Sequence, residues 1–300
     1  MKSDTPRQHR LCRLLLSGAG LLLAFGLAGA LSPALGAAAW PQREDARRHP
    51  PAHLASGHAA PMSLRFSDAI TYYVYLPLVA RAESCQPIPG EAYSTLSVNG
   101  PPTNRPAEEH ADLNLSLRGY EPTIAYQGLV NYNGGGDPGA PQLPGLFADQ
   151  RTGTFSGVYR VYDWNWACNC RGSLLTTWDV TLAGLAVTPG ETIHVPDSGY
   201  DIGAGYRALV LYASQERITL KYTREDNVVS GYTVHLENVC VEPGLLALYQ
   251  FWNGNGRGHL PALRAGQALG RARGDQIGVA VRDAGTFMDP RSRKDWWRGR

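Results

Sequence analysis

The chain has little net charge, and its body has no stretch in which basic residues alternate with aromatic ones. Its 300 residues include 28 Lys or Arg and 26 Asp or Glu, which gives a formal net charge of +2. Much of the arginine excess lies close to the two ends of the sequence. Proteins that bind nucleic acids concentrate basic charge on one surface. The charge pattern therefore argues against a nucleic-acid partner.

Several catalytic patterns are also missing. No G-x-S-x-G turn is present to carry a serine nucleophile. The segments GGGD and GNGRG lack the following helix and the Lys-Ser/Thr ending of a phosphate-binding loop. Paired carboxylates, as glycosidases use them, give no signal above chance in this sequence. None of these enzyme classes is indicated.

No apolar run long enough to span a bilayer occurs after the N-terminus, but one lies close to it. The run extends from Leu14 to Leu31 and is followed by the small-residue stretch ALGAAAW. Four basic residues precede it: Lys2, Arg7, Arg10 and Arg13. This order predicts a secretory signal peptide over residues 1–39, cleaved near Ala37 to Ala39. An uncleaved membrane anchor is the alternative, because the run is at the edge of spanning length. We expect a secreted or extracytoplasmic protein with no integral membrane span after cleavage.

Cysteine is scarce, with 5 in the chain, of which Cys12 precedes the apolar run. The other four are Cys85, Cys168, Cys170 and Cys240. An even number in an exported protein predicts up to two disulfides, with three connectivities. In extended chain the two cysteines of C-N-C are too close to pair with each other, so we expect each to pair with one of the two distant cysteines. A single C-x-C is not the spacing of a zinc site.

The remaining sequence favours strands joined by tight turns, with 34 Gly, 21 Pro and 15 Tyr. Residues 40–67 are polar and rich in Pro and His, which predicts a disordered linker. Residues 68–190 contain strand-like runs such as ADLNLSLRG and TFSGVYRVYDWNWAC. Residues 191–297 contain YRALVLYA, RITLKYT, GYTVHLENVCV and LLALYQFW, which are also strand-like. We expect an all-β fold, an antiparallel β-sandwich or barrel, without an amphipathic helix of more than a couple of turns.

Four motifs follow one another between about Thr192 and Trp296. They are DSGYDI at 197–202, YQF at 249–251, LRAGQALG at 263–270 and QIGVAVR at 276–282, with Asp289-Pro290 after the last. In this order they resemble the M23 family of zinc metallopeptidases, the lysostaphin-like enzymes that cut peptide cross-links in bacterial cell walls. The family patterns are His-x-Gly-x-Asp-Ile, Tyr-Ala-His, Val-x-x-Gly-Gln-x-Ile-Gly and His-Leu-His-Phe-Glu-Val-Arg. The resemblance covers about a third of the chain and implies a barrel-sandwich domain over residues 191–297.

The resemblance also implies that the zinc site has been lost. The family's three metal ligands correspond to Asp197, Asp201 and Gly278, and its other catalytic histidines to Gln276 and Phe251. A hydrolytic zinc needs about three protein ligands and an open position for water. Glycine has no side chain to supply a ligand, and phenylalanine cannot transfer a proton. We therefore expect no catalytic residue, no metal and no cofactor.

An active metallopeptidase with substituted ligands is one alternative, and it alone would require zinc. The shifted set of zinc ligands would be His194, Asp197, Asp201 and His235, whose side chains would have to converge on one metal ion. His259 is a further candidate ligand. Alternation along the strand YTVHLE argues against convergence, because it places His235 on the polar side of the strand. We expect that histidine to face solvent.

A carbohydrate-binding β domain is the other alternative. Trp164 and Trp166 are two residues apart, on one face of a predicted strand, as in a platform for a sugar ring. The same face carries Cys168 and Cys170, which favours burial of both rings.

The sequence thus predicts an exported, non-catalytic binding or structural module of the cell envelope or extracellular space, a pseudoenzyme related in fold to peptidases. Its ligand would be cell-wall peptide or glycan, held in the inherited groove. Six residues are predicted to line that groove: Asp197, Tyr200, Asp201, His235, Gln276 and Arg282.

Overall fold

The computed structural model describes residues 85–298. The predicted signal peptide and the linker of residues 40–67 lie outside the described residues. The strands are β1 (Ser94–Ser97), β2 (Tyr120–Pro122), β3 (Phe155–Asn165), β4 (Cys170–Leu174), β5 (Leu182–Ala186), β6 (Thr192–His194), β7 (Ala208–Ala213), β8 (Arg217–Lys221), β9 (Tyr232–Glu237), β10 (Val239–Val241), β11 (His259–Leu263), β12 (Ala268–Ala272), β13 (Gln276–Asp283) and β14 (Thr286–Met288). The helices are α1 (Leu115–Arg118), α2 (Pro243–Gly254) and α3 (Arg293–Trp296), with 3-10 turns η1 (Ala107–Glu109) and η2 (Leu143–Leu146).

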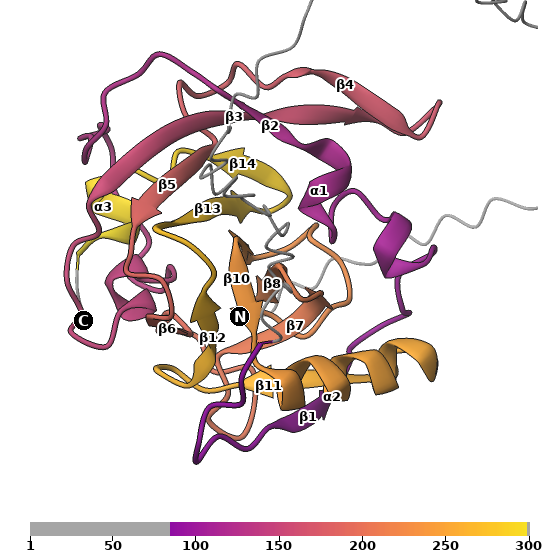
Figure 1. The fold of residues 1–300 in the computed structure, drawn as a ribbon. Coiled ribbons are helices and arrows are strands. Elements are labelled where there is room, and N and C mark those ends of the chain that lie inside the picture. The colour runs from indigo at the N-terminus through magenta and orange to yellow at the C-terminus, as the bar shows by residue number, and fades with distance from the viewer. Residues whose placement is uncertain (1–84, 299–300) are drawn as a thin grey trace, which may run out of the picture. The chain divides into compact units, whose positions relative to one another are not determined.

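Most of the described strands belong to one antiparallel sheet (Figure 1). Its order is β1-β11-β7-β8-β9-β13-β5-β3-β2, with β14 paired to β13 and β4 to β3, while β10-β12-β6 form a smaller sheet. The expectation of an all-β, antiparallel fold is confirmed. Strand β13 pairs with β5 on one side and β9 on the other, so strands from both sides of residue 190 share a sheet.

The central strands β8, β9 and β13 have two chemically different faces. Val234 and Leu236 alternate along β9 into the main hydrophobic core, and Ile277, Val279 and Val281 do the same along β13. The residues between them point to the opposite side of the sheet. We call that side the polar face, and it consists of Arg217, Thr219 and Lys221 of β8, Thr233, His235 and Glu237 of β9, and Gln276 and Arg282 of β13.

The polar face is covered by the segment that contains η1 and α1. The Thr219 hydroxyl donates to the carbonyl oxygen of Leu113 at 2.7 Å, and Asp112 pairs with Arg282 at 2.8 Å. Figure 1 shows α1 below the long ribbon of β3 and β4. This cover comes from a part of the chain more than one hundred residues before β9, so alternation within β9 gives no sign of it.

Two segments expected to be strands are helical. In ADLNLSLRG, Asn114 caps α1 by accepting from the backbone NH of Ser116, and Gly119 with φ of 69° follows the helix. In EPGLLALYQFW, Glu242 accepts from the backbone NH of Leu245 and Pro243 takes the first position of α2. The prediction that no helix would exceed a couple of turns is wrong, since α2 has 12 residues. No helix among the described residues is both long and apolar enough to cross a membrane.

The predicted disulfide connectivity is wrong as well. Cys85 pairs with Cys240, and Cys168 pairs with Cys170 across a single residue. The expectation assumed extended chain, whereas residues 166–169 form the turn between β3 and β4. Asn169 adopts a left-handed conformation with φ of 51°, and the two Cα atoms of the C-N-C segment are 5.2 Å apart. This separation is within the usual range for a disulfide.

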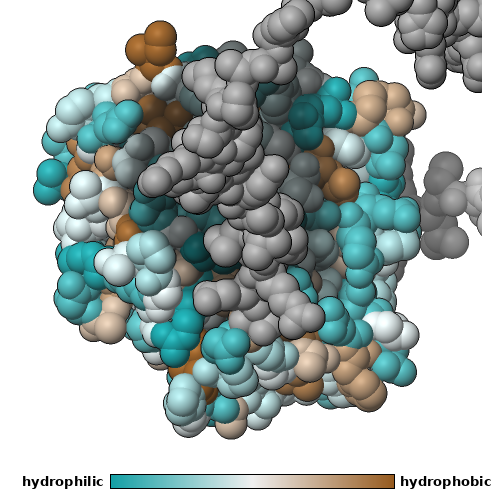
Figure 2. All heavy atoms as spheres, viewed as in Figure 1, coloured by the Kyte–Doolittle hydropathy of each residue, from teal (hydrophilic) through white to brown (hydrophobic). Residues whose placement is uncertain are grey.

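The described surface visible in Figure 2 is mainly hydrophilic or intermediate, and hydrophobic residues appear there as small separate patches. Single exposed apolar residues of this kind are ordinary on soluble surfaces.

Candidate functional site

The six residues predicted to line one groove lie in two parts of the structure. Asp197, Tyr200 and Asp201 belong to the loop between β6 and β7. His235, Gln276 and Arg282 belong to the polar face. Residues of that loop do not line the two cavities found at the ends of the polar face.

The loop residues are engaged in local structure. Asp197 accepts from Arg207 Nε at 3.0 Å, and the Asp201 carboxylate accepts from the backbone NH groups of Gly203 and Gly205. The Tyr200 hydroxyl donates to Asp137 Oδ2 at 2.7 Å. Asp201 thus closes a turn.

Within residues 85–298, no three residues among His, Cys, Asp and Glu form a group that could hold a metal ion. His194 lies in the smaller sheet, opposite Ala268 of β12, while His235 lies on β9 of the main sheet. The expectation of a metal-free protein stays a prediction.

His235 is buried, with 1% of its surface exposed, so the expectation that it faces solvent is wrong. Its ring stacks on Phe287 with centroids 5.9 Å apart, and its Nδ1 lies 3.0 Å from Thr219 Oγ1. Because the Thr219 hydroxyl hydrogen is donated to Leu113, Nδ1 must carry a hydrogen and donate to Oγ1. In this tautomer Nε2 is the bare nitrogen, and it has no hydrogen-bond partner among the described residues.

Burial and the nearby Arg282 charge hold the pKa of His235 well below its usual value, against a smaller opposing effect of Asp112. The folded protein therefore keeps this imidazole neutral, whereas the unfolded chain takes up a proton below about pH 6.5. The stabilisation is present above that pH and is lost as the pH falls below it.

Replacing His235 with glutamine is expected to make stability less sensitive to acid. The wild-type free energy of unfolding should fall by up to about 1.4 kcal/mol per pH unit from this group alone, and the variant should lack that contribution. Urea denaturation at about pH 7.5 and about pH 5.5 measures the difference. The control is His259→Gln at an exposed position. Equal acid sensitivity in wild type and His235→Gln would contradict the neutral buried tautomer.

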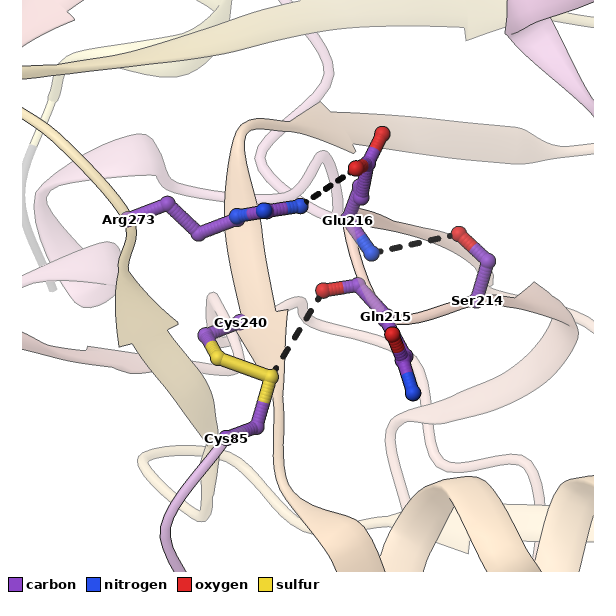
Figure 3. Close-up of a disulfide and its surroundings, with 6 residues drawn as sticks. All are labelled: Cys85, Ser214, Gln215, Glu216, Cys240 and Arg273. Atoms are coloured by element: carbon purple, nitrogen blue, oxygen red, sulfur yellow. Dashed lines mark hydrogen bonds and ion pairs between the residues drawn. A yellow bond between two sulfur atoms is a disulfide. The ribbon is translucent and has the colours of Figure 1, made fainter. Parts of the chain in front are cut away.

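One end of the polar face opens into a cleft of about 540 Å³. Its polar lining residues are Tyr120, Glu216, Arg217, Glu237, Arg273 and Gln276, together with Asn238. Arg273 pairs with Glu216 at 2.6 Å, beside the Cys85–Cys240 disulfide in Figure 3. Arg217 pairs with Glu237 at 3.1 Å and lies 3.7 Å from Glu216, so the two ion pairs are linked.

The two carboxyl groups of the cleft are in opposite environments. Burial raises the pKa of Glu237, and the Arg217 charge offsets only part of that effect. The hydrogen bond and charge of Arg273 lower the pKa of Glu216. The cleft therefore holds one carboxyl that retains its proton more readily than usual and one that ionises more readily.

Both polar atoms of the Gln276 side-chain amide are hydrogen-bonded. Tyr159 donates its hydroxyl hydrogen to Oε1, and Nε2 donates to Ser156 Oγ, both at 2.9 Å. The side chain lies across Gly184, where an added Cβ would come within 2.5 Å of the Gln276 Cδ atom. An amide cannot act as a general base, and this one is fixed as a hydrogen-bonding group in the wall of the cleft.

Gly278, which the motif resemblance aligns with a metal ligand, also lines the cleft. A Cβ added there would lie 3.1 Å from Glu237 Cβ and 3.3 Å from Leu182 Cδ2. Both contacts are tighter than is usual for a Cβ. The close approach of β9 and β5 therefore favours glycine at this point.

Sequence reasoning found Gln276 and Gly278 but missed the charged residues of the cleft. Alternation already placed Glu237 on the same side of β9 as His235, and that signal was available. Glu216 and Arg273 lie in turns beyond the ends of strands, where no periodicity applies. Tyr120 comes from β2, and no local pattern connects it to β9 or β13.

The two tryptophans of the sugar-platform alternative differ in exposure. Trp164 is 9% exposed and Trp166 is 43% exposed, so burial is found for one of the two rings. Their centroids are 6.3 Å apart in an edge-to-face arrangement. The Arg105 guanidinium lies 4.9 Å from the centre of the Trp166 ring, and the His110 ring packs edge-to-face against it. Trp166 is thus an exposed aromatic already in contact with two side chains.

No known protein family, curated protein or solved structure matches the chain. The likeness to zinc metallopeptidases therefore rests on the sequence motifs.

Proposed function

We propose that the protein is an exported, non-catalytic binding module of the cell envelope or extracellular space, and that its cleft holds cell-wall peptide or glycan. The observation that carries the proposal is the cleft at the end of the polar face, with two linked ion pairs, an aromatic ring and a fixed amide. Cell-wall peptides have both free carboxylates and amino groups, and each finds a partner of opposite charge in this lining. The ring of Tyr120, 36% exposed, is available to pack on a sugar.

Two further observations support the cellular and chemical parts of the proposal. The disulfides Cys85–Cys240 and Cys168–Cys170 fit an oxidising compartment, as the predicted signal peptide requires. Where the motif resemblance implies a proton-transferring histidine, the chain has the Gln276 amide, fixed by Tyr159 and Ser156. Where it implies a third metal ligand, the chain has Gly278, which has no side chain to supply one.

Replacing Arg273 with alanine is expected to weaken binding to purified peptidoglycan fragments without unfolding the protein. Arg273 is paired to an exposed carboxylate, and exposed pairs contribute at most about 1 kcal/mol to stability. Loss of one charge-assisted hydrogen bond to a ligand should weaken binding about tenfold. Calorimetric titration with soluble fragments and co-sedimentation with intact cell wall measure the effect.

The matched control is Arg271→Ala, two residues before Arg273 and near the end of β12. Arg271 donates to Gly190 O and Thr192 Oγ1 and does not line the cleft. If wild type fails to bind, or if both variants lose binding equally, the proposed cleft is wrong.

The opposed carboxyl groups favour a second candidate, a glycan hydrolase with Glu237 as acid and Glu216 as base or nucleophile. Enzymes of this kind depend on two carboxyl groups with pKa values displaced in opposite directions. Release of reducing ends from peptidoglycan by wild type, lost in Glu237→Gln while binding persists, would establish this candidate and overturn the non-catalytic one.

A further inference from the structure

A second cavity, of about 200 Å³, lies at the other end of the polar face from the cleft. The residues that line it include Arg118, Arg282, Phe287 and Asp163. Both arginine side chains are only 5% exposed. Lys, Glu, Arg and Asp are seldom so buried unless their charges are balanced.

The balance of charge here is incomplete. Arg118 and Arg282 share a single largely buried carboxylate, Asp112, each at 2.8 Å. Arg118 has a second acidic neighbour, Asp163, at 3.4 Å, but the Asp163 side chain is 63% exposed. The other hydrogen bonds of Arg282 go to the uncharged carbonyl oxygen of Gly285. Two buried positive charges thus face about one buried negative charge.

A third cationic side chain, Lys221, lies near the two arginines. Lys221 is fully buried on the same cross-strand row as Arg282, opposite Thr233. Burial lowers the pKa of Lys221 to about 8, and Arg282 adds to that effect, whereas Glu225 and Asp283 oppose it. Burial lowers the pKa of Arg282 too, with Arg118 acting in the same direction and Asp112 against it. Three cationic side chains, Arg118, Arg282 and Lys221, thus gather at this end of the polar face, and Asp112 is the carboxylate that the two arginines share.

An unused hydrogen-bonding group accompanies the charges. The Thr233 hydroxyl is buried and has no partner among the described residues. Its side chain shares the polar face with Arg282, because the two residues are directly paired in the β9–β13 ladder. Thr233 itself does not line the cavity, so ligand binding there relies on the two guanidinium groups.

The two guanidinium groups are held in place before any ligand arrives. The Phe287 ring centre lies 5.5 Å from the Arg118 Cζ atom and 4.6 Å from that of Arg282. Phe287 itself is paired with Arg282 across the β13–β14 ladder. Arg118 is further fixed by donating to the carbonyl oxygens of Ala111 and Tyr162. Preorganised donors lose little conformational entropy on binding.

We propose that this cavity binds a small oxyanion, a carboxylate or phosphate group, between Arg118 and Arg282. Two nearby guanidinium groups are the donors that such groups prefer, since each presents a planar fork of N–H bonds. The volume is below the usual range for a drug-sized ligand, which suits a small acid. The site is separate from the proposed polymer-binding cleft and does not depend on it.

The test is calorimetric titration of the full chain with inorganic phosphate and with acetate at constant ionic strength, chloride being the reference anion. We expect saturable binding of at least one of them, and the comparison separates a phosphate site from a carboxylate site. Asp163→Asn should bind at least about threefold more tightly, because a competing carboxylate next to Arg118 is removed. Asp163 is exposed, so this variant should fold.

The matched control is Asp179→Asn, which removes an exposed carboxylate 3.5 Å from Arg160, outside the cavity. It should bind the anions as wild type does. Arg282→Gln should abolish binding, and a folded circular dichroism spectrum must accompany that result. Absence of saturable binding in both wild type and Asp163→Asn, or an equal gain in the two aspartate variants, would overturn the proposal.

Discussion

Replacing both Cys85 and Cys240 with serine is expected to lower the free energy of unfolding by about 2–5 kcal/mol. The disulfide joins residues 155 positions apart, so its removal releases a long loop in the unfolded chain. It also frees Cys85 from β10, next to the turn in which Gln215 O lies 3.6 Å from the Cys85 sulfur (Figure 3). Chemical denaturation under non-reducing conditions measures the loss.

The paired comparison is the double replacement of Cys168 and Cys170 with serine. That disulfide closes a loop across one residue and lies in an exposed turn, so little entropy is removed from the unfolded chain. We expect a change below about 1 kcal/mol, since the effect depends on loop length. Equal losses from the two double variants would show that the long-range disulfide does not stabilise by restricting the unfolded chain.

The two disulfides also show what the sequence could and could not predict about local geometry. Strand alternation and turn composition gave the antiparallel character of the fold and placed His235 and Glu237 on one side of β9. They gave no information on the C-N-C turn, whose pairing depends on the left-handed conformation of Asn169. A non-glycine residue in the left-handed region is uncommon, so the sequence alone indicates an extended backbone at this position.

The helical state of α2 could not be predicted from composition for a different reason. LLALYQFW is apolar and aromatic throughout, and a short run of this kind has no period that separates strand from helix. The deciding signal was at its start, where Glu242 and Pro243 form a capping sequence. This start signal, and not the apolar composition, indicates the helix that contains Phe251.

The sequence could predict which residues of the candidate site share a face of one strand, but not which separate segments meet there. Gln276, Gly278 and Arg282 share a face of β13 because they are an even number of residues apart. The cover that residues 107–118 place over this face depends on long-range contacts such as that of Asp112 with Arg282. These residues are 170 positions apart, and no sequence period connects them.

Replacing Asp226 with asparagine is expected to be among the most destabilising single changes in the described part of the chain. Asp226 and Arg257 are both buried, and the carboxylate accepts from Arg257 Nε and Nη2 at 2.7 Å each. Burial lowers the pKa of Arg257, but the hydrogen bonds and charge of Asp226 outweigh that effect and the pKa is raised. Removing one partner leaves a buried, uncompensated charge, which costs about 3–5 kcal/mol.

The same pair joins four separate segments, which explains why its loss should affect the whole fold. Asp226 also accepts from the backbone NH of Thr103 at 2.9 Å. Arg257 also donates to Leu211 O of β7 at 2.8 Å and to the Tyr249 hydroxyl of α2 at 3.3 Å. The loop after β1, the segment after β8, strand β7 and α2 are thus connected through this ion pair.

A double-mutant cycle separates the buried charge from the loss of packing. Asp226→Leu combined with Arg257→Met removes both charges, so the double variant should be more stable than the sum of the single losses predicts. Asp179→Asn, which breaks the exposed Arg160 pair, should change stability by less than about 1 kcal/mol. Additive losses in the cycle would mean that Asp226 and Arg257 stabilise the fold independently, and that the cost of Asp226→Asn does not come from an unpaired guanidinium.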